Sequence, residues 1–434
     1  MRGIYKQILL VGVLLTCLLT ASCAAVAGGP GSFIDLSGKI SGDKMYDTAK
    51  RLSSIEQFRV AGLEGEKLAG NYIADRFHEM GLPVERQTFP LKTYRYRSSE
   101  VAITAPYEAV LESHSLMYSK TTSPEGVSGE VVYAGLGSEE EMAGLDVKGK
   151  IVLMRRGGEF FWQKTKRAYS HGAAGVIYFN PEAEDLVRAT LVTPSSIPAL
   201  SIHRSDGERI QQALSEGATV RVTIKENSET KDGSSENIIA RLTPSSGPQE
   251  KTIIIGAHYD GVDAAAANDN ASGVAVLLET ARLLAQQKLQ CNVVFVAFGA
   301  EEVGTVGSRY YVSQMNFREK ANTVGMLNLD MVGRGDTWYV FTVNEDAKSL
   351  PADLAVQCMG QFGYKNKRIG AYGSDHVAFE GAGISVAGFE GSPDPDYHTV
   401  RDSLDKLEKE DLIQICKVVT AVALKLDQSV QVKK

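Results

Sequence analysis

Apolar residues recur along this chain with two spacings, and the spacing changes from one part to the next. Between residues 43 and 80 they are spaced as on one face of a helix, with a Gly-rich break and with Gly81 at the end. Residues 84–104 have the pattern of strands. Short apolar runs bounded by turn residues follow at 130–133, 150–154, 175–179 and 220–224. We expect a helical beginning followed by a small β-rich domain.

The second half of the chain alternates apolar strand runs with amphipathic helices. Strands are expected at 252–257, 292–298 and 323–329, and helices at 272–287 and near 306–314. This alternation predicts an α/β fold with a doubly wound, largely parallel sheet flanked by helices.

The length of the chain supports two domains, because 434 residues exceed what one hydrophobic core usually serves. The change of pattern predicts one discontinuous domain at residues 39–104 and 229–430, with residues 105–228 inserted into it. Residues 227–235 are polar and Ser-rich, so we expect a linker or an exposed loop there.

The N-terminus has the form of an export signal. Arg2 and Lys6 precede an apolar stretch at residues 8–19, which ends in small residues rather than in a cluster of Lys and Arg. The stretch is too short for a comfortable membrane span. We therefore expect residues 1–23 to be a signal peptide that exports the protein, and the Ala-, Gly- and Ser-rich residues 24–38 to be a linker.

Whether Cys23 carries lipid determines whether the exported protein is anchored to a membrane or released. The run Thr20-Ala21-Ser22-Cys23 resembles a bacterial lipobox, whose cysteine carries lipid, although Thr20 replaces the usual Leu. Lipidation would anchor the protein to a membrane at the cell surface or in the periplasm, whereas cleavage near residues 25–27 would release a soluble, secreted protein. A lipid anchor is the only membrane contact that we expect.

The charge distribution argues against one class of partner, and the cysteine spacing argues against disulfides and thiolate metal sites. The formal charge is −7 with both signs spread along the chain, which argues against nucleic acid as a partner. Cys291, Cys358 and Cys416 lie in apolar patterns without paired spacing, so we expect buried small hydrophobes rather than disulfides or a thiolate metal site. Nothing in the pattern indicates an oligomeric state.

Ionisable residues follow three of the predicted strands directly. His258 follows the first strand of the alternating half, and Glu301 and Glu302 follow the second. Asp330 follows the third. In doubly wound sheets ligands bind beyond the carboxyl ends of the strands, so these side chains are expected at one edge.

Two further residues complete a set that suits metal ions. Asp269 precedes the helix after the first strand, and His398 lies in a loop after a strand at 384–389. Two imidazoles and three carboxylates suit zinc. A pair of zinc ions needs a bridging carboxylate, further N and O ligands on each ion, and a water molecule open for chemistry.

Each of these residues also has an ordinary structural explanation. Asp269 alone could cap a helix, and His258 alone could be a hydrogen-bonded group at a strand end. Glu301 and Glu302 could be solvated charges, but the glycines around them indicate a tight turn. Asp330 stands among apolar residues, which is costly unless a metal or partner compensates its charge. Together the five favour a metal site.

Five motifs in chain order resemble those of the zinc-dependent aminopeptidase and glutamate carboxypeptidase family, metallopeptidase family twenty-eight. They are Gly256-Ala257-His258-Tyr259-Asp260, Asn268-Asp269-Asn270-Ala271-Ser272-Gly273, Glu301-Glu302, Asn328-Leu329-Asp330-Met331 and Tyr397-His398-Thr399. The resemblance spans residues 40–427 or so. It implies a zinc exopeptidase fold with two zinc ions per chain and peptides as substrates.

The resemblance also implies a role for each site residue. His258 and Glu302 would each bind a different zinc ion, Asp269 would bridge both, and Asp330 and His398 would complete the two sets. Asp260 resembles the carboxylate that orients the imidazole ligand.

Two catalytic roles follow from the same resemblance. Glu301 resembles the general base, which takes a proton from the attacking water and gives it to the departing amine. Tyr397 resembles a residue that in some members donates a hydrogen bond to the oxyanion, although it could also be a packed aromatic ring.

The insert resembles a protease-associated domain, which in this family can cover the mouth of the active site. The motifs are Asp146-Val147-Lys148-Gly149-Lys150-Ile151-Val152-Leu153, His171-Gly172-Ala173-Ala174-Gly175-Val176-Ile177 and Ile197-Pro198-Ala199-Leu200-Ser201-Ile202. Its histidines, His114, His171 and His203, match no ligand motif and are expected to be structural. Because no candidate ligand falls in the insert, we expect its deletion to leave metal binding largely intact.

The sequence therefore predicts a two-zinc exopeptidase, with an aminopeptidase preferred because no arginine patch for a substrate carboxylate is recognisable. A carboxypeptidase of the glutamate carboxypeptidase type is the first alternative. A single-zinc glutaminyl cyclase shares the fold, but the filled set of Asp269, Glu302 and Asp330 favours two metals. A non-catalytic binding module would be expected to lack ligands. Ser374-Asp375-His376 resembles a pocket-lining loop, or else begins a helix capped by Ser374 or Asp375.

Overall fold

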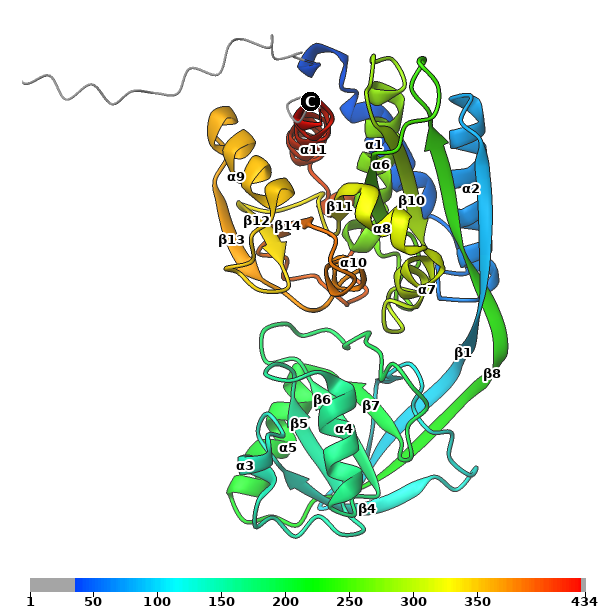
Figure 1. Ribbon diagram of the computed structural model, residues 1–434. Helices are drawn as coiled ribbons and strands as arrows, with labels where there is room; N and C mark the ends of the chain where they lie inside the picture. The colour runs from blue at the N-terminus through cyan, green and yellow to red at the C-terminus, as the bar shows by residue number, and fades with distance from the viewer. Residues whose placement is uncertain (1–35, 431–434) are drawn as a thin grey trace, which may run out of the picture. The chain divides into compact units, whose positions relative to one another are not determined.

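The computed structural model describes residues 36–430 (Figure 1). The predicted signal peptide, Cys23 and most of the predicted linker lie outside the described residues. Within residues 36–430 no helix combines the length and the apolar character that crossing a membrane requires. Cys291, Cys358 and Cys416 are buried and unbridged, as expected.

The larger part of the fold is built on a central sheet with the strand order β13-β12-β14-β11-β9-β10-β8. Neighbours from β14 to β10 are parallel, while β8 runs antiparallel to β10 and β12 runs antiparallel to β14. β13 is parallel to β12. The bounds are β8 (Arg221–Leu242), β9 (Thr252–His258), β10 (Asn292–Phe298), β11 (Thr323–Leu329), β12 (Thr337–Thr342), β13 (Asn366–Gly370) and β14 (Val386–Ser392).

The chain reverses its direction across this sheet at β9. It passes from β9 to its neighbour β10 and then returns past β9 to β11 on the other side. Right-handed crossovers then place the two connecting helical segments on opposite faces, which confirms the doubly wound, largely parallel sheet. The carboxyl ends of β9, β10 and β11 meet at this reversal.

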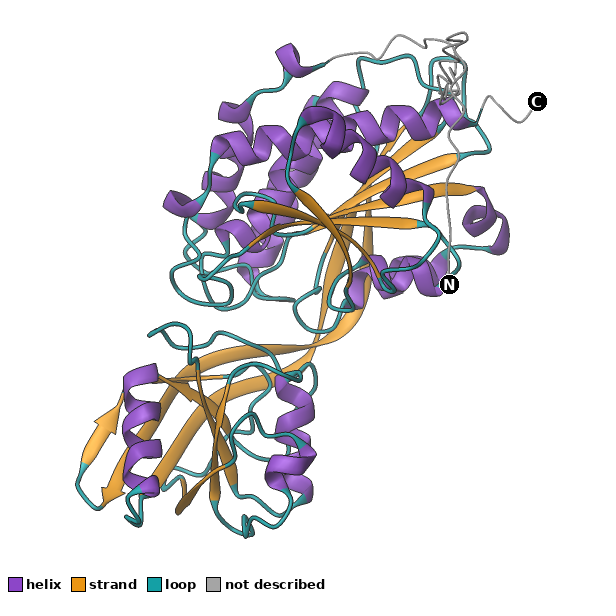
Figure 2. Cartoon of the chain, turned by 90° about the vertical axis from the view of Figure 1, so that its left-hand side faces the viewer, coloured by secondary structure: helices purple, strands orange, loops and turns teal. Residues whose placement is uncertain are grey.

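Two groups of helices cover the sheet, and Figure 2 shows helices on both sides of its strands. The helices of one group pack against one another. They are α1 (Gly42–Ser53), α2 (Glu64–Glu79), α6 (Gly273–Leu284), α9 (Leu350–Phe362) and α11 (Lys409–Ser429). In the other, α7 (Val306–Gln314) packs on α10 (His376–Gly381), and α8 (Phe317–Asn322) lies between α7 and β11 in the chain. The helical pattern at 43–80 is thus two helices separated at its Gly-rich break.

The insert has its own parallel strands. They are β4 (Val127–Tyr133), β5 (Ile151–Arg155), β6 (Gly175–Phe179) and β7 (Ala199–Ile202), with β3 (Ser113–Ser115) antiparallel on β7. The short apolar runs are confirmed as strands. The pattern did not predict α3 (Glu139–Met142), α4 (Phe161–Ser170) and α5 (Arg204–Ser215). Parallel strands need crossover connections, and α3 and α4 supply two of them.

The expected linker at residues 227–235 is wrong, because these residues lie inside β8. β8 pairs antiparallel with β1 (Val84–Ala105), and the two 22-residue strands form a continuous ribbon (Figure 1). β2 (Ala109–Leu111) adds to β1. The polar composition reflects ion pairs across the ribbon, for example Lys92–Asp232 at 2.6 Å and Arg97–Glu229 at 2.8 Å.

Candidate active site

The predicted site residues lie at the carboxyl ends of the central strands. His258 is the last residue of β9 and pairs in register with Phe298, the last residue of β10. Glu301 and Glu302 follow β10, and Asp330 follows β11. This arrangement confirms that residues far apart in the sequence meet at one edge of the sheet.

Five side chains form two trios that share Asp269. The Nε2 atom of His258 lies 3.2 Å from Oδ1 of Asp269 and 3.3 Å from Oδ1 of Asp330. The Nε2 atom of His398 lies 3.1 Å from Oδ2 of Asp269 and 3.1 Å from Oε2 of Glu302. Each oxygen of Asp269 therefore faces a different imidazole, so this residue does not act as the helix cap that it could have been.

The donor set fits zinc. In each trio the ligand atoms lie within 4.8 Å of one another. Three polar atoms of the trios, Nδ1 of His258, Oε1 of Glu302 and Nε2 of His398, are buried without a hydrogen-bond partner among the described residues. Three carboxylates packed around two imidazoles in a buried site are costly without a compensating cation. Imidazole and carboxylate donors are those that zinc accepts.

Mutual electrostatics shift the protonation of these groups. Burial alone would lower the pKa of His398, but Glu302 and Asp269 outweigh it and raise this pKa to about 9. His258 behaves in the same way: against the effect of burial, Asp330 raises its pKa well above the usual value. Burial and the neighbouring carboxylates raise the pKa of Glu302 to about 7. In the metal-free protein both imidazoles therefore carry protons near neutral pH.

Glu301 lies beside the trios but belongs to neither. Its side chain is buried, and burial raises its pKa well above the usual value, with Asp375 and Glu302 acting in the same direction and His258 opposing them. A carboxylate with a raised pKa can accept a proton and hold it near neutral pH.

Asp260 contacts the turn that carries the two glutamates. Its Oδ1 accepts a hydrogen bond from the N–H of Glu301 at 2.9 Å, and its Oδ2 accepts one from the N–H of Glu302 at 3.1 Å. Its Oδ1 also lies 3.6 Å from Nδ1 of His258, which is beyond hydrogen-bond length. Asp260 therefore positions the Glu301–Glu302 turn as well as facing the imidazole.

Sequence reasoning missed two buried charges that hold the loops of the site. Arg59 is 1% exposed, and its guanidinium donates to the carbonyl oxygens of Tyr259 at 2.8 Å and Ala266 at 2.7 Å. Asp402 accepts from the N–H of Asp269 at 3.0 Å. Neither belongs to a motif. The only signals are a charge among apolar residues at Arg59 and the position of Asp402 four residues after His398.

Tyr397 is half-buried beside the site, and its ring stacks on that of His398 with centroids 3.9 Å apart. Burial, Asp269 and Glu302 raise its pKa well above the usual value, so it stays protonated. Its hydroxyl makes no hydrogen bond within the described part of the chain and is free to donate one. Arg156 of the insert lies over the ring, with its guanidinium 5.2 Å from the centroid.

The loop at residues 374–376 and the three histidines of the insert form hydrogen bonds or ion pairs with neighbouring residues. Asn328 donates to the Ser374 hydroxyl at 2.7 Å, and Asp375 precedes α10 without capping it through its side chain. Burial raises the pKa of Asp375 to about 7. The insert histidines pair with carboxylates, namely His114 with Asp263, His171 with Glu139 and His203 with Glu112, and none joins a metal trio among the described residues.

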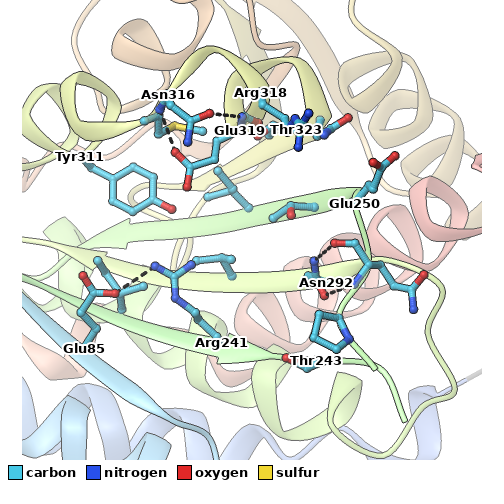
Figure 3. Close-up of a pocket in the computed structure, with 18 of the residues that line it drawn as sticks. Glu85, Arg241, Thr243, Glu250, Asn292, Tyr311, Asn316, Arg318, Glu319 and Thr323 are labelled. Atoms are coloured by element: carbon cyan, nitrogen blue, oxygen red, sulfur yellow. Dashed lines mark hydrogen bonds and ion pairs between the residues drawn. The ribbon is translucent and has the colours of Figure 1, made fainter. Parts of the chain in front are cut away.

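A cavity of about 600 Å³ lies elsewhere on the same domain (Figure 3). Its lining includes Thr252, Asn292 and Thr323, which are the first residues of β9, β10 and β11. In the two trios, His258 is the last residue of β9, and Glu302 and Asp330 follow the last residues of β10 and β11. The cavity therefore lies at the opposite edge of the sheet, and we do not assign the substrate to it.

Comparisons with known proteins agree with this geometry. Profiles of peptidase family M28 and of the PA domain match residues 237–423 and 127–210. Aminopeptidase YwaD of Bacillus subtilis is 32% identical over 391 residues, covering 87% of this chain and 83% of the relative. A protein named "Probable lipoprotein aminopeptidase LpqL" from Mycobacterium tuberculosis is 28% identical and covers 88% of this chain and 85% of its own length.

Solved structures show the same relationship. An aminopeptidase from Aneurinibacillus sp. strain AM-1 superposes with a TM-score of 0.73 at 33% identity, covering 90% of this chain and 95% of that one. BSAP, a zinc aminopeptidase from Bacillus subtilis, superposes with a TM-score of 0.75 at 30% identity, covering 89% and 95%. With the shared sheet, the PA insert and identity above 30% over most of both chains, this chain belongs to peptidase family M28.

Proposed function

We propose that this protein is an aminopeptidase that holds two zinc ions per chain and releases N-terminal residues from peptides. The observation that carries the proposal is the position of Asp269, whose two oxygens face the imidazoles of two separate trios. His258 and Asp330 would hold one ion, Glu302 and His398 the other, and Asp269 both. The names of the relatives, which are aminopeptidases, support the choice of substrate end.

Zinc in this site would lower the pKa of water and polarise the scissile carbonyl. The chain's own residues supply the rest. Glu301 would accept the proton of the attacking water and later deliver it to the departing amine, since its raised pKa suits both steps. The free, protonated hydroxyl of Tyr397 would donate a hydrogen bond to the oxyanion that develops on the substrate.

Two alternatives remain as outcomes of the test. A carboxypeptidase would have to bind a free substrate carboxylate, and a glutaminyl cyclase would use one metal ion. The shared carboxylate between two trios favours two ions over one. Zinc bound per chain and the choice of substrate therefore separate these functions.

We also propose that the protein is exported and anchored through lipid on Cys23. Two observations support this. Residues 1–23 consist of a positively charged start, an apolar stretch and a run of small residues that ends at Cys23. One relative is named as a probable lipoprotein. Metabolic labelling with a radiolabelled fatty acid tests this, with Cys23→Ser as the unlabelled control. Labelling of the Cys23→Ser variant, or no labelling of the native chain, would contradict the lipid anchor.

The function is tested with aminoacyl p-nitroanilides, N-blocked analogues of them, and dipeptides with a blocked or free C-terminus. We expect hydrolysis that needs a free α-ammonium group on the substrate. Removal of the metal with an excess of chelator should stop the hydrolysis, and added zinc should restore it. Full activity of verified metal-free protein would refute the metal-dependent reaction. Hydrolysis that needs a free C-terminal carboxylate would instead support a carboxypeptidase.

A further inference from the structure

The turn between β10 and Glu302 is held by side chains at four consecutive amides. The N–H of Gly299 donates to Oδ1 of Asn237 at 3.2 Å. The N–H of Ala300 donates to Oε1 of Glu66 at 3.0 Å. The amides of Glu301 and Glu302 donate to Asp260, as described above. Two buried carboxylates from distant parts of the chain therefore fix three successive peptide groups.

Glu66 lies in α2 and is 2% exposed. Besides the Ala300 amide, it accepts the hydroxyl of Ser235 on Oε1 at 2.7 Å and the N–H of Gly62 on Oε2 at 2.6 Å. Its three partners are all donors, and none is a cation. Burial raises the pKa of this carboxyl group to about 8, and its oxygens accept hydrogen bonds that join α2, β8 and the turn.

The backbone of the turn shows why such a contact matters. Ala300 has φ of +56°, a left-handed conformation that is unfavourable for a residue other than glycine. Gly299 has no room for a side chain, because a Cβ there would stand 2.4 Å from Oγ of Ser235 and 2.9 Å from Oε1 of Glu66. The bond from Ala300 to Glu66 opposes relaxation of this strained residue, which directly precedes Glu301.

We propose that Glu66 is a positioning residue for the general base, acting on Glu301 through the amide of Ala300. The inference rests on the proposed function. Loss of the bond would let Ala300 relax and turn the Glu301 carboxylate away from the substrate. Asp260 holds the amides of both glutamates, but only the Glu302 side chain would also be held by zinc, so Glu302 is affected less. The effect therefore falls on kcat rather than on KM or zinc content.

The test compares Glu66→Gln with a matched control, Asp427→Asn. Asp427 is 4% exposed and accepts the amides of Gln290 and Cys291, both at 2.7 Å, beside the other end of β10. With two zinc ions bound and KM within about twofold, Glu66→Gln is expected to lower kcat by about 10- to 100-fold, as a small misplacement of a reacting group does. Asp427→Asn is expected to keep kcat whatever its effect on Tm.

A double-mutant cycle separates positioning from general destabilisation. Combined with Glu301→Gln, the Glu66→Gln change should cause little further loss, because the base it positions is already absent. An equal loss in both backgrounds would overturn the proposal, as would a kcat loss no larger than that of Asp427→Asn. If the native protein shows no zinc-dependent peptidase activity, the proposed function fails first, so the two failures are distinguishable.

Ser235→Ala provides a second variant if Glu66→Gln does not fold. It leaves the carboxylate in place but removes one of its donors, so a smaller loss of kcat in the same direction is expected. An unchanged kcat in Ser235→Ala, together with an insoluble Glu66→Gln, would count against the proposal.

Discussion

The backbone N–H of Arg188 donates a hydrogen bond of 2.8 Å to the carbonyl oxygen of His398. Arg188 belongs to the insert and His398 to the loop that would carry a zinc ligand. Nearby, Arg156 donates to the carbonyl oxygen of Tyr397 at 3.1 Å, and Arg401 forms an ion pair with Asp185. The insert therefore holds the ligand loop at several points.

These contacts reverse the sequence-based expectation for deletion of residues 105–228. One hydrophobic cluster contains both insert residues, such as Val187 and Leu191, and residues of the glutamate turn, Ala300 and Val303. Deletion would expose that cluster and release the ligand loop. We now expect the deleted protein to bind zinc weakly or to aggregate, which metal analysis and size-exclusion chromatography can check. A soluble deletion protein with two zinc ions would restore the first expectation.

Arg156→Met tests the contribution of the insert to catalysis in the intact chain. The change removes the hydrogen bond to Tyr397 and the cation above its ring, so we expect kcat to fall by about three- to tenfold. Arg209→Met is the matched control, because Arg209 lies 5.7 Å from the ring centroid of Tyr107, another tyrosine of the insert. Steady-state kinetics of the two variants should differ. Equal values would show that Arg156 only stabilises the fold.

The same substitution at the neighbouring residues Glu301 and Glu302 should have different effects. Glu301→Gln cannot accept a proton, so turnover should fall by about two to four orders of magnitude while both zinc ions stay bound. Glu302→Gln replaces an anionic ligand by a weak neutral one, so zinc content should fall, and stability with it. Metal analysis and kinetics of the purified variants check this. Zinc loss in Glu301→Gln with zinc retained in Glu302→Gln would reverse the assigned roles.

Zinc binding should strengthen as the pH rises. In the metal-free protein Glu302 and Asp269 raise the pKa of His398 to about 9, and Asp330 raises that of His258 well above its usual value, so both imidazoles carry protons near neutral pH. Binding must expel the protons, so the apparent affinity should rise by up to about tenfold for each unit by which the pH is raised, for each proton released. Competition with a chelator from about pH 6 to about pH 9 measures the slope. An affinity independent of pH would refute the prediction.

Tyr397→Phe should lower kcat without a matching change in KM. The variant keeps the ring that stacks on His398 and loses only the hydroxyl, which is one donor to the oxyanion. Loss of such a donor costs about a hundredfold in kcat. Kinetics with one aminoacyl p-nitroanilide, at verified zinc content, provides the measurement. A Tyr397→Phe enzyme with full kcat would identify Tyr397 as a packed aromatic ring.

The ligand candidates could be predicted because each follows a recognisable strand or occupies a recognisable motif. His258, Glu301 and Asp330 are polar residues placed directly after apolar runs, and parallel strands bring their carboxyl ends together. The prediction that Asp269 bridges two metal ions came from the family resemblance, and in the structure its two oxygens face the imidazoles of His258 and His398.

Other features could not be predicted, because they depend on partners distant in the sequence. Arg59 and Glu66 bond to backbone groups of residues more than a hundred positions away, and no periodicity records such bonds. The segment at 227–235 has the composition of a loop, but its charges pair with those of β1. Composition alone does not distinguish a solvated loop from a polar strand whose partner lies elsewhere.

The ribbon of β1 and β8 also sets an order of events during synthesis. Val84 pairs with Ala240, and Ala105 pairs with Arg221, so the whole insert must leave the ribosome before β1 can find its partner. Such long-range pairing is slow to form and leaves an unpaired edge exposed while it waits. Substitutions that slow folding of the insert should therefore lower the yield of the peptidase domain in cells, even where the finished enzyme has normal activity.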